Sequence, residues 1–283
     1  MTSFEEVSVT DELAEPGLGD RGVGDVCYRR DGHVATLTID RPQRRNAMSF
    51  ETLAGLRDGV LRAKADREVR VLVLTGSGDK AFCSGADLGG LRGQDVDPEV
   101  AHAGRGHLAE LFTTLWGAGI PTIAKVRGYA LAGGFGLAMS CDIVIASDDA
   151  TFGAPEVAIG LWPYMITVPL TRSMPPKIAL ELMMTGRRVP ADEAARLGFV
   201  NTVVRAGDLD RTVEEMAALL ASRSPSAIRL GRSSFYQTLG APAESALPLL
   251  HATLSVATTT DDAAEGVAAF AEKREPVWGR RQS

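Results

Sequence analysis

The feature of this chain that most restricts its fold is a glycine-rich turn that opens an apolar helix and leads into an apolar strand. It lies at the start of the run from Gly128 to Pro163, GYALAGGFGLAMSCDIVIASDDATFGAPEVAIGLWP. Glycine at a helix start lets a backbone N–H approach a ligand closely, because no Cβ intervenes. The N–H groups and the positive dipole end at such a terminus favour an oxygen that carries negative charge. The turn therefore predicts a site that stabilises an anion.

Glu156 follows this turn and stands in an otherwise uncharged stretch, ATFGAPEVAIGLWP. A carboxylate in apolar surroundings has a raised proton affinity, which suits a general base that works near neutral pH. An anion-stabilising turn followed by such a base indicates proton transfer beside a carbonyl group.

Strand and helix patterns alternate over the first two thirds of the chain. Strand patterns occur at 33–39, 69–74, 121–126, 143–146 and 201–204. Helical patterns occur at 50–65 with Ser49 as N-cap, at 101–115, at 133–139, and over most of the chain after Pro176. Strands that alternate with helices predict an α/β fold with a parallel sheet and helices outside it.

Composition excludes several classes of function. The net charge of −6 argues against nucleic acid as the main partner, because nucleic-acid binding favours a basic face. The three cysteines are far apart without metal-ligand spacing, which predicts reduced thiols in a cytoplasmic protein. His102 and His107 are five residues apart, the wrong spacing for one helix face, so no metal site is expected. The least charged run, 129–141, is too short and too rich in glycine to span a membrane.

Two further sequence patterns resemble catalytic motifs without their context. Gly76-Ser77-Gly78 follows an apolar strand, but no helix begins within these glycines, as a dinucleotide fingerprint requires. Ser84 and Ser140 have no partnered histidine in their sequence context, which disfavours a serine hydrolase. The acidic, glycine-containing residues 1–24 lack the basic start and apolar core of a signal peptide and are expected to form a mobile N-terminal tail.

Several sequence blocks, in one order, resemble the crotonase (enoyl-CoA hydratase/isomerase) superfamily, over roughly residues 25 to 280. The blocks are RPQRRNA at 41–47, KAFCSGADL at 80–88, the run from Gly128 to Pro163, LMMTG at 182–186, ADEA at 191–194, GFVN at 198–201, EGVAAF at 265–270 and EKR at 272–274. The resemblance implies a crotonase-like spiral of β-β-α turns, with a core domain at 25–205 that binds acyl-CoA. It also implies a C-terminal helical trimerisation region at 206–283, in a homotrimer or a dimer of trimers.

The same resemblance assigns site residues. It places the two backbone N–H donors to the thioester oxygen at Ala86 and Gly133 and the catalytic glutamate at Glu156. No tightly bound cofactor is implied, since coenzyme A is part of the substrate. Besides Ala86 and Gly133, the residues expected to contact substrate or coenzyme A are Arg44, Arg45, Ala47, Ser84, Asp87, Leu88, Gly134, Pro155, Trp162, Phe270 and Lys273. Arg44 and Arg45 are either solvated surface charges or flank the phosphates of coenzyme A.

Position 136 departs from the hydratases of this superfamily, which carry a second glutamate where this chain has Gly136. Hydration requires a water to be held and activated while a proton reaches the α carbon. Isomerisation of a 3-enoyl to a 2-enoyl thioester needs only one base. The residues therefore favour an isomerase, with an enoyl-CoA hydratase as the alternative; an acyl-CoA decarboxylase and a non-catalytic acyl-CoA-binding relative also stay open. Helix propensity predicts that a glutamate at 136 would be tolerated.

A second departure follows Glu156. Where the family has a proline and then glycines, this chain has bulky groups in the run Trp162-Pro163-Tyr164-Met165-Ile166-Thr167. Trp162, Tyr164 and Met165 are either core residues or the lining of an acyl pocket. In the second case the substrate would be short, branched or ring-bearing.

Overall fold

The larger of two sheets carries the apolar segments of the sequence as mainly parallel strands. The computed structural model describes residues 20–21, 25–87 and 97–279. The sheet has the order β1-β2-β3-β4-β6-β8-β11, in which β3 and all strands after it are parallel and β1 and β2 are antiparallel. The strands are β1 Asp20–Arg21, β2 Val26–Asp31, β3 Val34–Ile39, β4 Val71–Gly76, β6 Thr122–Val126, β8 Ile143–Ser147 and β11 Thr202–Val204. The parallel core predicted from the alternating pattern is confirmed.

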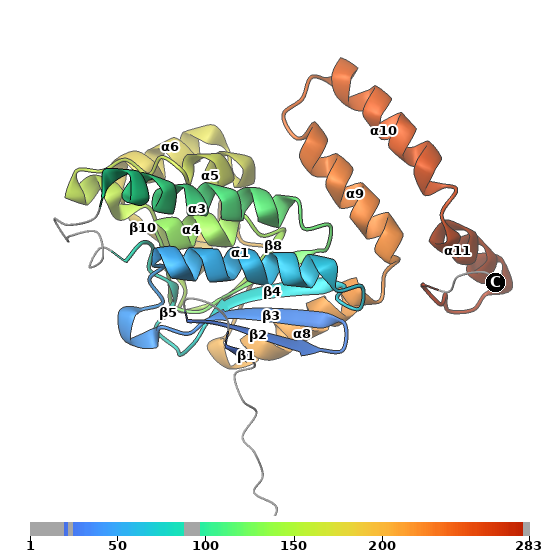
Figure 1. The fold of residues 1–283 in the computed structure, drawn as a ribbon, viewed down its shortest axis with the longest axis horizontal. Coiled ribbons are helices and arrows are strands. Elements are labelled where there is room, and N and C mark those ends of the chain that lie inside the picture. Colours follow the sequence, from blue (N-terminus) through green and yellow to red (C-terminus); the bar gives the residue numbers. More distant parts are fainter. Residues whose placement is uncertain (1–19, 22–24, 88–96, 280–283) are drawn as a thin grey trace, which may run out of the picture.

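Both faces of this sheet are buried, which explains the near-continuous apolar run in β4. Leu72 and Leu74 belong to the main core on one face, whereas Val71 and Val73 pack against α8 on the other. Helices α1, α3 and α4 lie over the main-core face (Figure 1). These helices are α1 Phe50–Ala65, α3 Pro98–Trp116 and α4 Gly133–Met139. Helix α8, Leu209–Ala221, lies on the other face. Ser49 caps α1 by accepting a hydrogen bond from the Thr52 N–H, as predicted.

A second, smaller sheet has the order β10-β9-β7-β5. Its strands are β5 Ala81–Cys83, β7 Tyr129–Leu131, β9 Thr151–Gly153 and β10 Arg188–Pro190, of which only β10 is antiparallel to its neighbour. Phe152 of this sheet packs with Phe135 of α4 and with Phe199, at ring-centroid distances of 5.7 and 5.6 Å. The aromatic cluster fixes the small sheet against the helix that begins at the glycine-rich turn.

Short helices lie between the strands and the longer helices. They are η1 Pro42–Arg44, η2 Pro155–Ile159, α5 Thr167–Ser173, α6 Pro176–Thr185, α7 Ala191–Arg196 and η3 Ala206–Asp208. Between β9 and β10 the chain forms η2, α5 and α6, and α6 contacts η2 closely. This contact places the Glu156 segment beside α6.

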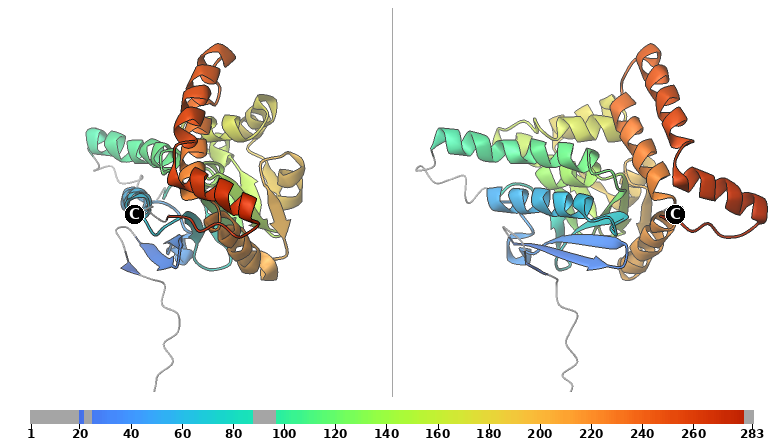
Figure 2. Two further views of the ribbon diagram at one scale, coloured as in Figure 1. Left: turned by 90° about the vertical axis from the view of Figure 1, so that its right-hand side faces the viewer. Right: turned by 45° about the vertical axis from the view of Figure 1, so that its right-hand side comes forward.

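The last three helices extend away from the sheets (Figure 2). They are α9 Pro225–Thr238, α10 Ala243–Ala257 and α11 Asp261–Glu272; we call them the C-terminal arm. Because α8 packs on the large sheet, the sheet-packed part of the chain extends to Ala221, beyond the expected limit at residue 205. At the other end, β1 pairs with β2, so Asp20–Arg21 are not part of a free tail, while 1–19 and 22–24 lie outside the described residues.

Asp142 and Arg232 fasten the C-terminal arm to the core. Arg232 Nε donates to Asp142 Oδ2 over 2.7 Å, and its two terminal nitrogens donate to the carbonyls of Trp116 and Leu115. Asp142 also accepts from the N–H of Thr122 at 2.7 Å. The guanidinium is 8% exposed. The structure thus assigns Asp142 a structural role.

No helix in the described ranges is long and apolar enough to cross a bilayer.

Candidate active site

Three loops that carry expected site residues meet at one edge of the small sheet. Strands β5, β7 and β9 are parallel neighbours, and the segments that follow them are Ser84–Ala86, Ala132–Gly133 and Ala154–Glu156. The carboxyl ends of parallel strands lie at the same edge of a sheet. The fold therefore brings Ala86, Gly133 and Glu156 to one place from three separate parts of the sequence.

Ala86 and Gly133 have backbone N–H groups suited to a common acceptor. Met48 forms both hydrogen bonds of its parallel bridge with Ala86: its N–H donates to Gly85 O (2.8 Å) and its carbonyl accepts from Asp87 N–H (2.9 Å). In this pattern the N–H of the opposite residue faces the other side. Gly133 begins α4, so its N–H has no intrahelical acceptor. A Cβ on Gly85 would lie 3.4 Å from the Gly133 nitrogen, so the two segments are in contact.

The close backbone approach in this turn occurs at Gly134. A Cβ on Gly134 would lie 2.1 Å from the carbonyl oxygen of Cys83, whereas one on Gly133 would come no closer than 3.2 Å to any of its neighbours, and that neighbour is the flexible end of Met48. Ala132 is held at φ 50° and ψ −126°, a conformation that a residue with a Cβ rarely adopts. Its N–H donates to Gly153 O over 2.8 Å, which joins the ends of β7 and β9.

Glu156 lies in η2 with one carboxylate oxygen buried. The Oε2 atom is inaccessible to solvent and accepts no hydrogen bond from the described residues. Burial raises the pKa of this carboxyl above its usual range, and a hydrogen bond from its own backbone N–H offsets part of that rise. The burial indicated by the sequence is present, and a half-buried carboxyl with a raised pKa could act as a general base, which stays a prediction.

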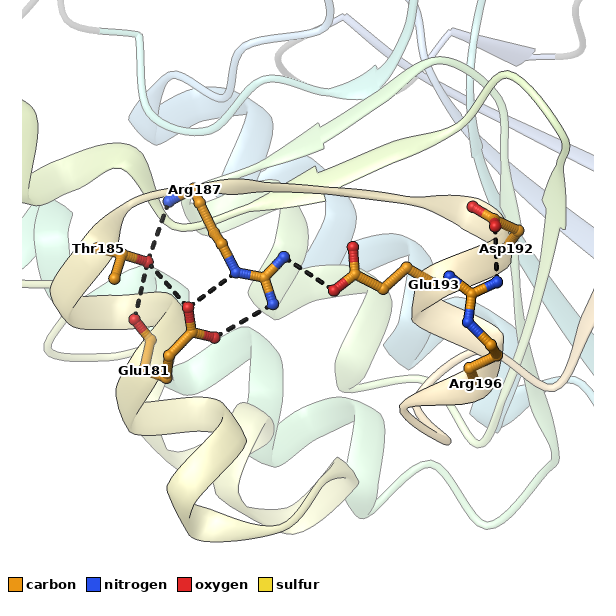
Figure 3. A network of polar contacts seen from close by, with 6 residues as sticks. All are labelled: Glu181, Thr185, Arg187, Asp192, Glu193 and Arg196. Atoms are coloured by element: carbon orange, nitrogen blue, oxygen red, sulfur yellow. Dashed lines mark hydrogen bonds and ion pairs between the residues drawn. The ribbon is translucent and has the colours of Figure 1, made fainter.

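The chain from the end of α6 to Arg187 lies beside the segment that carries Glu156. Gly186, which precedes Arg187, packs against this segment: a Cβ on Gly186 would lie 3.1 Å from Val157 and 3.4 Å from Pro155. The Arg187 guanidinium binds Glu181 with two nitrogens, at 2.8 and 3.2 Å, and Glu193 with the third, at 2.9 Å (Figure 3). These ion pairs are partly exposed, so we assign them a modest energy and a positioning role.

The space beside Gly136 is filled. A Cβ on Gly136 would lie 2.4 Å from Cγ2 of Ile166 and 3.0 Å from Cζ of Phe112. Ile166 is only 2% exposed. The expectation that a glutamate would be tolerated at this position is therefore wrong: helix propensity favours glutamate, but tertiary packing leaves no room for it.

The bulky residues after Glu156 have different environments. Trp162 and Met165 are partly buried and pack against the main core, whereas Tyr164 is 76% exposed. Ile166, which was not singled out from the sequence, is buried, with 2% of its surface exposed. Tyr164 is therefore not a core residue.

Asp87 and Ala47 hold the Ala86 loop through a residue that sequence reasoning missed. Arg41 binds Asp87 Oδ2 at 2.9 Å and donates to the carbonyl of Ala47 at 2.6 Å. Asn46, fully buried, donates to the carbonyls of Ser77 and Ala81 at 2.9 and 2.7 Å. The Asp87 carboxylate is thus engaged with Arg41. The available signal was the pair of polar residues Arg41 and Asn46, the first and the second-last of the RPQRRNA block.

Arg44 and Arg45 are exposed at the end of η1. The Arg45 guanidinium lies 5.9 Å from the ring centre of Tyr129, and its carbonyl accepts from the Ser84 N–H. An open hollow of about 320 Å³ adjoins them, lined by Pro42, Gln43, Arg45, Asn46, Ser77, Gly78, Asp79, Lys80 and Ala81. Arg45 and Lys80 give this hollow cations that suit a phosphate group.

The remaining expected contacts are not brought to the site within one chain. Phe270 is 88% exposed on α11, and Lys273 follows it at the end of that helix. Helix α11 lies at the end of the C-terminal arm, away from the sheets (Figures 1 and 2). Leu88 lies outside the described residues. Within the described ranges, no three side chains of histidine, cysteine, aspartate or glutamate are grouped as metal ligands.

Comparison with known proteins places this geometry among related structures. Residues 29–281 match the model of the enoyl-CoA hydratase/isomerase family. Carnitinyl-CoA dehydratase of Escherichia coli K12 is 36% identical over 258 residues, which cover 89% of this chain and 97% of the relative. The crystal structure of human enoyl coenzyme A hydratase domain-containing protein 3 has a TM-score of 0.86 at 30% identity and covers 90% of this chain and 100% of its own. The crystal structure of an enoyl-CoA hydratase of Mycobacterium smegmatis has a TM-score of 0.86 at 35% identity. The match covers 90% of this chain and 98% of the hydratase chain.

Proposed function

Because the chain belongs to the enoyl-CoA hydratase/isomerase family and has its crotonase fold, we propose that it transforms an acyl-CoA thioester through an enolate. The N–H groups of Ala86 and Gly133 bind the thioester oxygen, and Glu156 moves the proton. The observation that carries the proposal is the buried, unpartnered Oε2 of Glu156 at the edge where the two backbone donors lie. One oxyanion donor contributes about 2.7–4 kcal/mol to transition-state stabilisation in enzymes of this kind.

The reaction we favour is isomerisation of a 3-enoyl-CoA to a 2-enoyl-CoA. Glu156 removes a proton from C2, the negative charge spreads to the thioester oxygen and C4, and the same carboxyl returns the proton at C4 as the double bond moves. No atom is gained or lost. The filled space beside Gly136 supports a mechanism with one base, because a second carboxylate has no place there.

The second candidate is reversible hydration of a 2-enoyl-CoA. It is favoured by the relatives, which include a carnitinyl-CoA dehydratase and an enoyl-CoA hydratase. In this case a second polar group must hold the water. Decarboxylation of a malonyl-type CoA and binding without catalysis are the remaining alternatives, since both need the backbone donors but no strong base.

The coenzyme A part of the substrate is assigned to the exposed cations beside the hollow, Arg44 and Arg45, and to a neighbouring copy of the chain. We propose a homotrimer, or a dimer of trimers, in which the C-terminal arm reaches the adjacent subunit and supplies Phe270 and Lys273. The apolar surface of the arm supports this, because Leu247, Leu254 and Phe270 are 64%, 61% and 88% exposed. Sedimentation of the wild type and of Phe270→Ser tests the assembly.

Mass spectrometry of the products separates the candidate reactions. Wild-type protein is incubated with a 3-enoyl-, a 2-enoyl- and a malonyl-type CoA ester in separate reactions. Isomerisation leaves the mass unchanged and shifts the double bond, hydration adds one water, and decarboxylation removes carbon dioxide. We expect the first outcome to dominate; rapid hydration of the 2-enoyl ester would favour the second candidate instead.

A further inference from the structure

One face of α4 carries both the proposed oxyanion donor, Gly133, and Gly136, and apolar side chains lie against this face. Gly133 and Gly136 are one turn apart and therefore share a face of the helix. Helix α3 runs along this face: Leu108 lies 3.5 Å from a Cβ position on Gly133, and Phe112 lies 3.0 Å from that on Gly136. The space next to the donor is thus lined by apolar side chains of α3.

Ile166, at the start of α5, fills the space beside Gly136. It is the residue immediately before α5, and α5 packs against α4. Its Cγ2 and Cβ atoms would lie 2.4 and 2.8 Å from a Cβ on Gly136, so its side chain occupies the room that any larger residue would need. At 2% exposure Ile166 has no contact with bulk solvent.

This closure bears on the fate of the enolate. Water that adds to an enoyl thioester must be hydrogen-bonded by polar groups beside the acyl chain, and an apolar space does not retain such a water. The side chains of Phe112 and Ile166, which lie against Gly136 from α3 and from the start of α5, have no polar atom, so they offer no hydrogen bond to a water at that position. The described loops at this edge carry two carboxylates, of which Asp87 is bound by Arg41 at 2.9 Å and Glu156 has a buried oxygen without a partner among the described residues.

We propose that Ile166 determines the reaction specificity of this site, by excluding from the Gly136 position both a polar side chain and the water it would hold. The inference rests on the proposed acyl-CoA chemistry. It makes Gly136 and Ile166 a coupled pair, in which either residue can be enlarged only if the other is reduced. Exclusion of water by Ile166 also favours reactions whose product is a 2-enoyl thioester to which no water has been added.

The test places a carboxylate at position 136, once with Ile166 present and once with Ile166 replaced by glycine. The double variant Gly136→Glu/Ile166→Gly is compared with Gly136→Glu alone and with the matched control Gly136→Gln/Ile166→Gly, which has the same shape without a basic group. Each is given a 2-enoyl-CoA in H₂¹⁸O, and the hydrated product is measured by mass. We expect hydration by the double variant to exceed that of the wild type and of the glutamine control at least tenfold. Gly136→Glu alone should lose thermal stability or fold poorly.

The outcomes separate this inference from the proposed function. A wild type that acts on none of the CoA esters refutes the proposed function itself. A wild type that isomerises, together with a folded double variant that hydrates no faster than its glutamine control, overturns only the role of Ile166. So does a Gly136→Glu variant with wild-type melting temperature. If the double variant does not fold, Ile166→Gly with added formate decides: hydration that rises with formate concentration supports the proposal, and hydration independent of formate overturns it.

Discussion

One methyl group added at Gly134 should separate the two segments that carry the proposed backbone donors. In Gly134→Ala the new Cβ would lie 2.1 Å from the carbonyl oxygen of Cys83 and 2.7 Å from its carbon. Non-bonded atoms of this kind approach to roughly 3.5 Å, so α4 and β5 must move apart by more than about 1 Å. Both sides of the contact are backbone, and no rotation of a side chain relieves it. We therefore expect a loss of stability near the upper end of the overpacking range, about 3 kcal/mol.

The displacement should also reduce activity, because Cys83 leads directly into the loop of Ala86. A shift of about 1 Å in a catalytic group can cost about 10²-fold in rate. Urea unfolding followed by circular dichroism and a kcat/KM measurement on one preparation give both quantities. The matched control is Gly133→Ala, which gains the same helix propensity and whose closest new contact is the movable end of Met48, at 3.2 Å. Equal unfolding free energies for the two variants would refute the steric reasoning.

The other stability predictions concern three polar or strained positions. Glu156→Gln should raise the unfolding free energy by about 1–3 kcal/mol at neutral pH. Because burial raises the folded-state pKa of Glu156, the stability of the wild type falls as the pH rises through that pKa. In acid the wild-type carboxyl is protonated, so the stability advantage of the variant must disappear there. Ala132→Gly should stabilise by about 1 kcal/mol, since relief of the positive φ exceeds the entropy cost of glycine, and a lower melting temperature would contradict this. Arg232→Ala should destabilise by about 3–5 kcal/mol in urea unfolding because it leaves Asp142 without its buried partner; a loss below 1 kcal/mol would show that the pair does not hold the arm.

Local sequence patterns predicted the elements whose stability depends on local residues. The apolar run that contains β4, the Ser49 cap of α1 and the bounds of α4 were read correctly, because periodicity and capping act within a few residues. The small sheet was not predicted. Its strands have three residues each, too few to show a period, and β7 lies inside the segment that was read as a turn.

Contacts between distant residues account for the other differences. The obstruction of Gly136 by Ile166 spans 30 positions and cannot be seen in helix propensity, which describes only α4. Asp87 lies in a motif that suggested a ligand contact, but its carboxylate is bound by Arg41, 46 residues earlier. The Glu156 environment was predicted because its apolar neighbours are local in sequence and the burial they indicate is what raises its pKa.

Exchange of the α proton of a saturated acyl-CoA, such as butyryl-CoA, in D₂O tests the central claim most directly. A saturated ester can be neither isomerised nor hydrated, so deuterium uptake reports only enolate formation by the backbone donors and the base. We expect uptake with the wild type, an acid limb in its pH profile above the usual range of a glutamate pKa, and a decrease of about 10²–10⁴-fold in Glu156→Gln. Uptake by Glu156→Gln at the wild-type rate, or none by the wild type, would contradict the assignment of Glu156 as the base.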